Sequence, residues 1–597
     1  MHKEFLMGNA AIGRGAVYAG LDCIAGYPGT PSSEVLETVA KVNDGSIYVE
    51  WSVNEKAALE LAAGASYCGA RSMVTMKQVG LNVASDPLMS LAYVGVKGGM
   101  IIMVADDPGP ISSQTEQDTR TFAAYSKLPC FDPSSVEEAF YMVRDAFELS
   151  EKYHTPVILR PTTRICHAYA SIAVPEKDDY IHTSPEGFVK DSSRWVIFPR
   201  LSYKNHIEIE KRDRELTSVL SEYKRNSFEK GDLKIGIASH GISSSYVREV
   251  LSEMKEKPSF LNVATPFPFP EQLAVEFLKC CDEVFCIEEL DPVIERELTY
   301  LCGKYHLDTC INGKLTGDIH PAGENDPTYV KNVLNSIMGK TDVPVKAADA
   351  PELPARPPVL CAGCPHRASF YAVKTAMKGR KAVFCGDIGC YTLGNAQPLD
   401  MVDTCLCMGA GVDIAQGIGK IEPDTTCFAF VGDSTFFASA VTGVINGVYN
   451  QADMTLIVLD NSTTAMTGHQ PHPGTGRTMM GEVVEKVDIA AVLHGAGVKT
   501  VETVDPLDLE KAVETVRSVS AEKGVKAIIF KSPCAILIKP EKPVIISESC
   551  TQCKKCIKSL GCPGLVISQG KVAIEAALCT GCGLCAQVCP FHAIQKG

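Results

Sequence analysis

Residues 427–434 read CFAFVGDS, an apolar run that ends in a glycine, a carboxylate and a hydroxyl. A second apolar run, MTLIVLD at residues 454–460, is followed directly by Asn461, Ser462 and Thr463. Short apolar runs of this kind are typical of buried strands in a parallel sheet, where ligands bind beyond the carboxyl ends of the strands. The two runs therefore predict an α/β domain that presents oxygen ligands from two strand ends.

These strand ends carry the residue types that suit Mg²⁺ and a diphosphate. Mg²⁺ takes a few protein oxygens and completes its octahedron with substrate phosphates, while Gly432 allows the backbone to approach a diphosphate closely. A lone Gly-Asp-Ser is equally typical of an ordinary turn. Its pairing with Asp460-Asn461, which also follows an apolar run, favours the metal site.

The C-terminal segment contains two similar runs of cysteines. Each run has three cysteines at two-residue spacing and a fourth directly before a proline. In two-cluster ferredoxins this fourth cysteine ligates the other cluster. Four-cysteine zinc sites, which also use C-x2-C pairs, are the alternative. The spacing favours two [4Fe–4S] clusters, one on Cys550, Cys553, Cys556 and Cys589 and the other on Cys562, Cys579, Cys582 and Cys585.

Composition excludes several classes of protein. The chain has 597 residues, too many for one core, and is 45% hydrophobic and 21% charged, as globular proteins are. A net charge of −14 argues against binding to nucleic acid or an anionic membrane. We see neither a secretory signal nor an apolar run long enough to span a bilayer, so the 25 cysteines are expected to be reduced thiols of a cytoplasmic protein.

Changes of pattern along the chain predict six segments. Alternating strand-like and helical stretches indicate α/β domains with parallel sheets, charge clusters without periodicity indicate a connection, and a proline-rich stretch indicates a linker. The tail could not bury a core without a covalent or metal staple. The expected segments are α/β domains at 1–185, 233–345 and 359–540, a connecting segment at 186–232, a linker at 346–358 and a ferredoxin-like α+β module at 541–597.

The strand ends at Gly432-Asp433-Ser434 and Asp460-Asn461 resemble the G-D-G and N-N motif of thiamine diphosphate enzymes. Together with the cysteine tail, they make the chain similar to the 2-oxoacid:ferredoxin oxidoreductases over nearly its whole length. The order of the segments is most similar to that of alpha subunits of the indolepyruvate branch. The resemblance implies thiamine-binding folds at 1–185 and 359–540 and a transketolase C-terminal-like domain at 233–345.

The resemblance also implies roles for individual residues. The side chains of Asp433 and Asn461 and the carbonyl of Thr463 are expected to hold Mg²⁺. Thr30, in a Gly-Thr-Pro-Ser-Ser stretch, is a candidate contact to the 2-oxoacid. Glu55 is expected to promote the imino tautomer of thiamine diphosphate, the alternative being an ordinary solvated helix carboxylate. The predicted cofactor-binding set is Thr30, Glu55, Gly432, Asp433, Ser434, Asn461, Thr463 and Met466.

Four further cysteines match the family pattern for a third [4Fe–4S] cluster beside thiamine. They are Cys361, Cys364, Cys390 and Cys534. The alternative is a zinc half-site at the first two and buried thiols at the others. Cys385, close to Cys390 in the sequence, serves as the comparison residue for any test.

The substrate carboxylate needs a positively charged partner. Pyruvate-specific relatives place an arginine near the strand after the thiamine helix, but here that strand runs into Ala105-Asp106-Asp107-Pro108. His366, His469 and His472 are the candidates in its place, although a loop histidine is more often hydrogen-bonded to its neighbours only.

The resulting hypothesis is oxidative decarboxylation of an arylpyruvate of the indolepyruvate type to aryl-acetyl-CoA and CO₂ by a catalytic alpha subunit. Ferredoxin would accept the electrons, and a separate beta subunit would complete a hetero-oligomer built around a dimer of alpha subunits. The alternatives are another 2-oxoacid such as pyruvate or an aliphatic one, a non-oxidative thiamine decarboxylase, and a non-catalytic iron–sulfur electron-transfer subunit.

Overall fold

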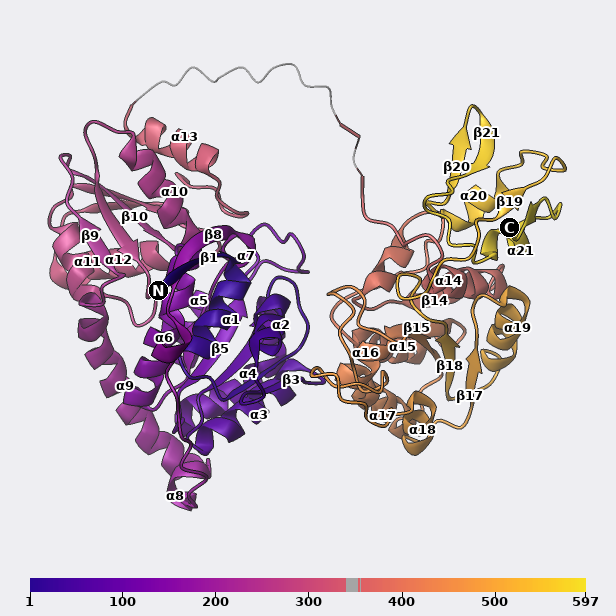
Figure 1. Cartoon of the computed structure of the whole chain (residues 1–597), viewed down its shortest axis with the longest axis horizontal. Coiled ribbons are helices and arrows are strands. Elements are labelled where there is room, and N and C mark those ends of the chain that lie inside the picture. The colour runs from indigo at the N-terminus through magenta and orange to yellow at the C-terminus, as the bar shows by residue number, and fades with distance from the viewer. Residues whose placement is uncertain (340–352, 355) are drawn as a thin grey trace. The chain divides into compact units, whose positions relative to one another are not determined.

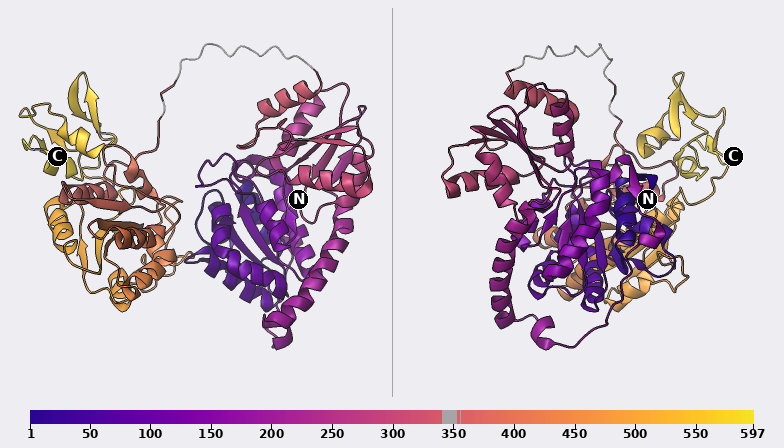
Figure 2. Two further views of the ribbon diagram at one scale, coloured as in Figure 1. Left: turned by 180° about the vertical axis from the view of Figure 1, so that it is seen from behind. Right: turned by 60° about the vertical axis from the view of Figure 1, so that its left-hand side comes forward.

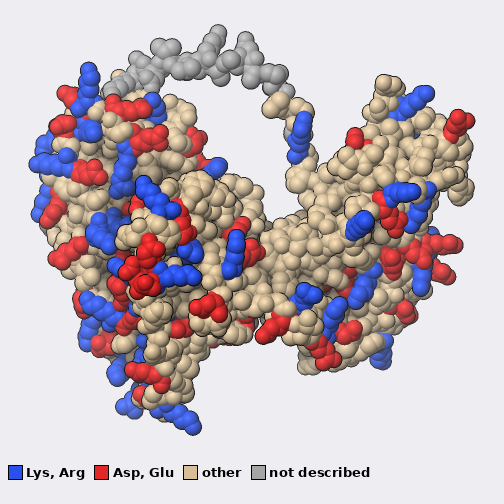
Figure 3. Space-filling view, viewed as in Figure 1, with Lys and Arg blue, Asp and Glu red and all other residues tan. Residues whose placement is uncertain are grey.

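The computed structural model describes residues 1–339, 353–354 and 356–597, so most of the predicted linker at 346–358 lies outside the described residues. The chain divides into two compact units, Met1–Ala348 and Asp349–Gly597 (Figure 1). Across the described ranges, no helix has the length and apolar character needed to cross a membrane. On the face drawn in Figure 3, acidic and basic side chains are interspersed over the first unit.

The first unit begins with a six-stranded sheet of order β3-β2-β4-β5-β7-β6, in which every pairing is parallel. This confirms the predicted parallel α/β fold, and the apolar run of β5 is completely buried. The strands are β2 (Cys23–Gly26), β3 (Tyr48–Trp51), β4 (Ser72–Lys77), β5 (Met100–Ala105), β6 (Cys130–Phe131) and β7 (Val157–Leu159). The helices are α1 (Gly8–Tyr18), α2 (Ser33–Val42), α3 (Glu55–Tyr67), α4 (Gln78–Val94), α5 (Thr119–Ser126), α6 (Val136–Tyr153) and α7 (Thr163–His167). A separate antiparallel pair joins β1 (His2–Met7) to β8 (Tyr169–Val174).

A second sheet of the first unit has the order β13-β12-β10-β11-β9. Its pairings are parallel except that β9 runs antiparallel to β11. The segment between the two sheets contains the long helix α9, which contacts both α4 and α11 and is visible in the views of Figure 2. The elements are α8 (Ser192–Trp195), α9 (Pro199–Ser221), β9 (Ser227–Glu229), β10 (Ile235–His240), α10 (Gly241–Ser252), β11 (Ser259–Val263), α11 (Glu271–Leu278), β12 (Glu283–Ile287), α12 (Val293–Tyr305), β13 (Cys310–Asn312) and α13 (Pro327–Ile337).

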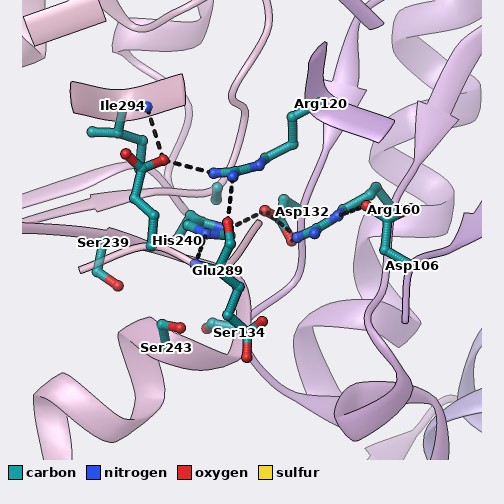
Figure 4. Close-up of polar contacts among 12 residues, drawn as sticks. Asp106, Arg120, Asp132, Ser134, Arg160, Ser239, His240, Ser243, Glu289 and Ile294 are labelled. Atoms are coloured by element: carbon teal, nitrogen blue, oxygen red, sulfur yellow. Dashed lines mark hydrogen bonds and ion pairs between the residues drawn. The ribbon is translucent and has the colours of Figure 1, made fainter. Parts of the chain in front are cut away.

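The two sheets of the first unit meet through buried ion pairs (Figure 4). The Arg160 guanidinium lies 2.7 Å from Asp106 and 3.2 Å from Asp132, and Asp132 in turn lies 2.7 Å from His240 at the end of β10. Arg120 pairs in the same way with Asp118 and, across the sheets, with Glu288 at 2.9 Å. Both arginine side chains are fully buried, and burial lowers the pKa of His240 to about 4.

Removal of one buried partner leaves an uncompensated charge in a low-dielectric environment. We expect Arg160→Met to destabilise the first unit by about 3–5 kcal/mol, because two buried carboxylates lose their cation. Arg164→Met is the matched control, since the Arg164 side chain is 53% exposed and its ion pair with Glu324 is solvated. The measurement is urea unfolding of the full chain followed by circular dichroism. Equal midpoints for the two variants would contradict the expectation.

The second unit is built on a five-stranded sheet of order β14-β15-β16-β18-β17 with parallel pairing throughout. The two apolar runs predicted as parallel strands are the neighbouring strands β15 and β16, which confirms that prediction. The strands are β14 (Ala382–Cys385), β15 (Thr426–Gly432), β16 (Met454–Asp460), β17 (Val501–Val504) and β18 (Val525–Lys531). The helices are α14 (Pro365–Ala376), α15 (Ala410–Ile421), α16 (Asp433–Thr435), α17 (Val441–Tyr449), α18 (Ile489–Gly495) and α19 (Leu509–Val519).

The cysteine-rich tail belongs to the same unit. Ala368 on α14 is buried against tail residues that include Leu560, Leu584 and Val588, so helix and tail share one apolar core. The tail elements are β19 (Ile545–Ile546), α20 (Lys555–Leu560), β20 (Leu565–Ser568), β21 (Lys571–Ile574), α21 (Leu584–Val588) and β22 (Ile594–Gln595).

Candidate functional site

Oxygen ligands gather at one edge of the sheet in the second unit. Asp433 follows β15 and Asn461 follows β16, and these neighbouring parallel strands end at the same edge. Asp433, Asn461 and Thr463 are all buried. The structure thus brings together the residues that the two strand ends predicted as a group.

The Asp433 carboxylate is only partly satisfied. Its Oδ1 accepts a hydrogen bond from the Ser434 N–H at 2.9 Å. Its Oδ2 lies 3.1 Å from His472 Nε2, and neither of these two buried atoms forms a hydrogen bond among the described residues. Burial raises the pKa of Asp433. A buried carboxylate oxygen that forms no hydrogen bond, although a histidine lies nearby, suits a cation, so the donor set fits Mg²⁺.

The three predicted histidines lie in different settings. His366 starts α14 beside Asn461, with 3.2 Å between its Nε2 and the Asn461 Nδ2. Burial lowers the pKa of His366 to about 4, so at neutral pH its ring is uncharged and offers hydrogen bonds instead of a positive charge. His472 faces Asp433, whereas His469 lies in the following loop with a positive φ of 66°. Met466, in the same loop, is 53% exposed.

A third strand end contributes Asp387, which the sequence analysis missed. It follows β14, accepts the Gly409 N–H at 2.8 Å and accepts the Tyr391 hydroxyl at 2.8 Å. The Tyr391 ring lies so close to Gly432 that a Cβ there would come within 2.5 Å of it. Close packing against Tyr391 therefore requires glycine at position 432. The stretch from 382 to 387, AVFCGD, is another apolar run ending in a carboxylate and could have revealed Asp387.

The four cysteines predicted for a third cluster lie near this edge. The Cys534 N–H donates to the Asn461 carbonyl at 3.1 Å. The pKa of Cys390 is raised to about 11, mainly by burial and to a smaller extent by the nearby thiols of Cys534 and Cys361. Burial raises the pKa of Cys364 to about 12, with a smaller contribution from Cys361. Cys385, by contrast, belongs to a hydrophobic core cluster with Cys427.

The eight tail cysteines line two cavities, four to each. One cavity is lined by Cys550, Cys553, Cys556 and Cys589, and the other by Cys562, Cys579, Cys582 and Cys585. Each set is one of the two predicted ligand sets. Within the described part of the chain, no three His, Cys, Asp or Glu side chains converge as they would around a single metal ion.

The second of these cavities also contacts the third cysteine group. Ala362, Gly363, Cys364 and Arg367 line it together with the four tail cysteines. Gly363 has a φ of 74°, and a Cβ there would lie 2.0 Å from Thr580 Oγ1. Only glycine fits this contact, which holds the loop at 361–364 against the tail.

Glu55 is buried at the first position of α3 in the first unit. Asn54 caps the helix by accepting the Ala57 N–H, and a Cβ on Gly80 would lie 2.4 Å from Glu55 Oε1. Burial raises the pKa of Glu55 to about 7. Glu55 is therefore not a solvated helix carboxylate, unlike Glu60, which is exposed and pairs with Lys56.

Lys77, at the end of β4, is a second residue that the sequence analysis missed. Its Nζ donates to the Ser112 carbonyl at 3.0 Å, and Ser112 Oγ donates to the Thr30 carbonyl at 3.0 Å. The side chain runs along Gly29 and is half-buried, and burial lowers the pKa of Lys77. The charges of Asp107 and Glu55 act in the opposite direction on this pKa, although neither carboxylate forms an ion pair with the ammonium group at 4 Å or less. Lys77 thus brings a cation, in the field of Asp107 and Glu55, next to the Gly29-Thr30 loop.

Comparison with known proteins adds three family matches. Residues 14–227 match "Pyruvate flavodoxin/ferredoxin oxidoreductase, thiamine diP-bdg", residues 387–530 match "Thiamine pyrophosphate enzyme, C-terminal TPP binding domain", and residues 572–595 match "4Fe-4S binding domain". The first two include Glu55 and Asp433, and the third includes the second cysteine run. The chain therefore has thiamine diphosphate-binding domains and an iron–sulfur domain.

Curated relatives cover nearly the whole chain. "Indolepyruvate oxidoreductase subunit IorA" of Archaeoglobus fulgidus is 39% identical over 99% of this chain and 97% of its own length. The protein of the same name from Methanothermobacter thermautotrophicus is also 39% identical, with the same coverage of both chains. "Ketoisovalerate oxidoreductase subunit VorB" of Methanothermobacter marburgensis is 26% identical over only 46% of this chain. The chain therefore belongs to the indolepyruvate oxidoreductase subunit IorA family, within the 2-oxoacid:ferredoxin oxidoreductases.

Proposed function

We propose that this chain is the catalytic alpha subunit that converts arylpyruvates of the indolepyruvate type to aryl-acetyl-CoA and CO₂ and passes the electrons to ferredoxin. The observation that carries the proposal is the hydrogen bond from Cys534 to Asn461, which links the third cysteine group to the Asp433 edge. Redox centres next to a thiamine site serve an oxidative reaction and have no part in simple decarboxylation. This favours the oxidoreductase over the non-oxidative decarboxylase.

Asp433, Asn461 and the Thr463 carbonyl are proposed to hold Mg²⁺, with Gly432 and Ser434 beside the diphosphate. The buried Asp433 Oδ2, which forms no hydrogen bond although His472 Nε2 lies 3.1 Å away, supports this assignment. Thiamine diphosphate, when bound, supplies the electron sink for loss of CO₂. Glu55 would hold or release the proton that the cofactor's aminopyrimidine requires, and a pKa of about 7 would let its carboxyl group do so near neutral pH.

Lys77 and Thr30 are proposed to position the 2-oxoacid. The Lys77 ammonium group provides the positive charge that the Ala105–Pro108 segment lacks, and its single backbone hydrogen bond leaves donors free for a carboxylate. His366 is uncharged at neutral pH and therefore contributes a hydrogen bond only. This assignment holds for any 2-oxoacid and does not select an aryl group.

The three cysteine groups are proposed to hold three [4Fe–4S] clusters, which supply one-electron transfer when bound. The shared lining of one tail cavity by Cys364 and the tail cysteines supports a continuous route. Relatives are named as subunits, which supports a separate beta subunit in a hetero-oligomer. The aryl preference rests on the names of the full-length relatives, and pyruvate or an aliphatic 2-oxoacid is the alternative.

An anaerobic panel of 2-oxoacids, with the two-subunit complex and coenzyme A, tests the reaction by reduction of a dye. Indolepyruvate is expected to give the highest kcat/KM.

Glu55→Gln should lower kcat by about 10²–10⁴-fold because proton exchange is lost. Lys77→Met should instead raise KM for every accepted 2-oxoacid. Glu60→Gln, a change on the exposed face of the same helix, should have no effect.

Aldehyde formation without dye reduction would contradict the oxidative reaction and favour a decarboxylase. No turnover with any 2-oxoacid would favour an electron-transfer subunit. A preference for pyruvate would contradict only the substrate assignment.

Asp433→Asn should weaken binding of thiamine diphosphate in the presence of Mg²⁺ by roughly 100-fold, since the metal loses its charged ligand. Titration calorimetry on the cofactor-free chain, with and without Mg²⁺, measures this directly. Asp424→Asn, on the exposed side of the same domain, is the control. Unchanged affinity in Asp433→Asn would remove the magnesium assignment.

Iron quantitation on anaerobically purified chain should give about twelve irons, four for each cluster. Cys390→Ser should lower the value to about eight, because one cluster loses a ligand. Cys385→Ser should leave it unchanged, since that thiol lies in a hydrophobic core. About eight irons in the unmodified chain would contradict the third cluster.

A further inference from the structure

Arg367 connects the third cysteine group to the tail. It lies in the first turns of α14 and is only 4% exposed. Its Nη1 donates to the Leu560 carbonyl at the end of α20, and its Nη2 donates to the carbonyls of Leu360 and Cys361. One guanidinium therefore holds the loop before Cys364 against the helix before Cys562.

The positive charge of Arg367 is not balanced by a carboxylate. No Asp or Glu of the described residues lies within 4 Å of it, and its buried Nε has no hydrogen-bond partner. Arg120 and Arg160, the fully buried arginines of the first unit, each have two carboxylates. A buried unpaired cation is strongly unfavourable, so Arg367 needs an anion from another source.

The cavity beside Arg367 provides the place for that anion. Arg367 lines the cavity formed by Cys562, Cys579, Cys582 and Cys585. A cluster held by four thiolates is anionic and gains one more negative charge on reduction. A cation in this low-dielectric position interacts with it far more strongly than one in water.

We propose that Arg367 is the buried counter-charge of the cluster on Cys562, Cys579, Cys582 and Cys585 and raises its reduction potential. This inference rests on the proposed cluster assignment. Since the cation favours the reduced state, it eases the transfer of an electron into this cluster. Arg367 acts through the cluster and through the Cys361 loop, and it contacts no substrate.

The test is a redox titration of the anaerobically purified two-subunit complex, followed by electron paramagnetic resonance together with iron quantitation. Arg367→Met should make reduction of the cluster next to Arg367 about tenfold less favourable. For a one-electron couple this lowers the reduction potential by about 59 mV. Arg367→Lys keeps the charge and should stay close to the wild-type potential. Lys374→Met is the matched control, because Lys374 lies on the same helix, also binds two backbone carbonyls and lines neither cysteine cavity.

An intact signal with an unshifted potential in Arg367→Met would overturn this inference alone. An equal shift in Arg367→Lys or in Lys374→Met would also overturn it, because charge at this position would not be the cause. If Arg367→Met loses four irons, the inference is tested on Arg367→Lys instead. A cluster that Arg367→Lys retains at the wild-type potential supports the inference, and loss of the cluster in Arg367→Lys overturns it. A wild-type chain without [4Fe–4S] signals would overturn the cluster assignment and this inference with it.

Discussion

The Asp433 carboxylate is buried at the end of β15, with one oxygen bound to a backbone N–H and the other facing His472 without a hydrogen bond. Burial of a carboxylate is unfavourable unless a donor or a cation compensates for the lost water. The local structure supplies part of this compensation through the Ser434 N–H and leaves the rest for a ligand. Such a site is stable only when the parallel strands on either side fix its position.

The same requirement explains the other buried charges. In the first unit, Arg120 and Arg160 each have two carboxylate partners, so their charges are compensated within the protein and join the two sheets. Glu55 and Lys77 attract each other only at longer range than an ion pair, and Arg367 forms no ion pair with a carboxylate among the described residues. The arginine ion pairs hold the two sheets together, whereas Glu55, Lys77 and Arg367 lie where cofactor, substrate or a cluster is proposed to bind.

Local contacts made by small residues allow these groups to approach one another. Gly432 admits the Tyr391 ring, Gly80 admits the Glu55 carboxylate, and Gly363 admits Thr580 of the tail. In each case a Cβ would lie 2.5 Å or less from the neighbouring atom. The tail packs on α14 and is not a free appendage, which keeps the third cysteine group and the tail cavity in contact.

The sequence by itself determined the features that depend on local periodicity and spacing. The apolar runs of β15 and β16, the parallel α/β class and the two sets of tail cysteines could all be read from residues close together in the chain. Only the tertiary structure decided which charges are buried and which are paired, because partners such as Asp132 and His240, or Arg367 and Leu560, are far apart in the sequence. Asp387 and Lys77 were not singled out, and the family resemblance that selected Glu55 could not show that this carboxylate is buried whereas Glu60 is exposed. Buried and exposed carboxylates differ in pKa because burial removes water from the charged group. Burial depends on the folded surroundings and not on the residue type.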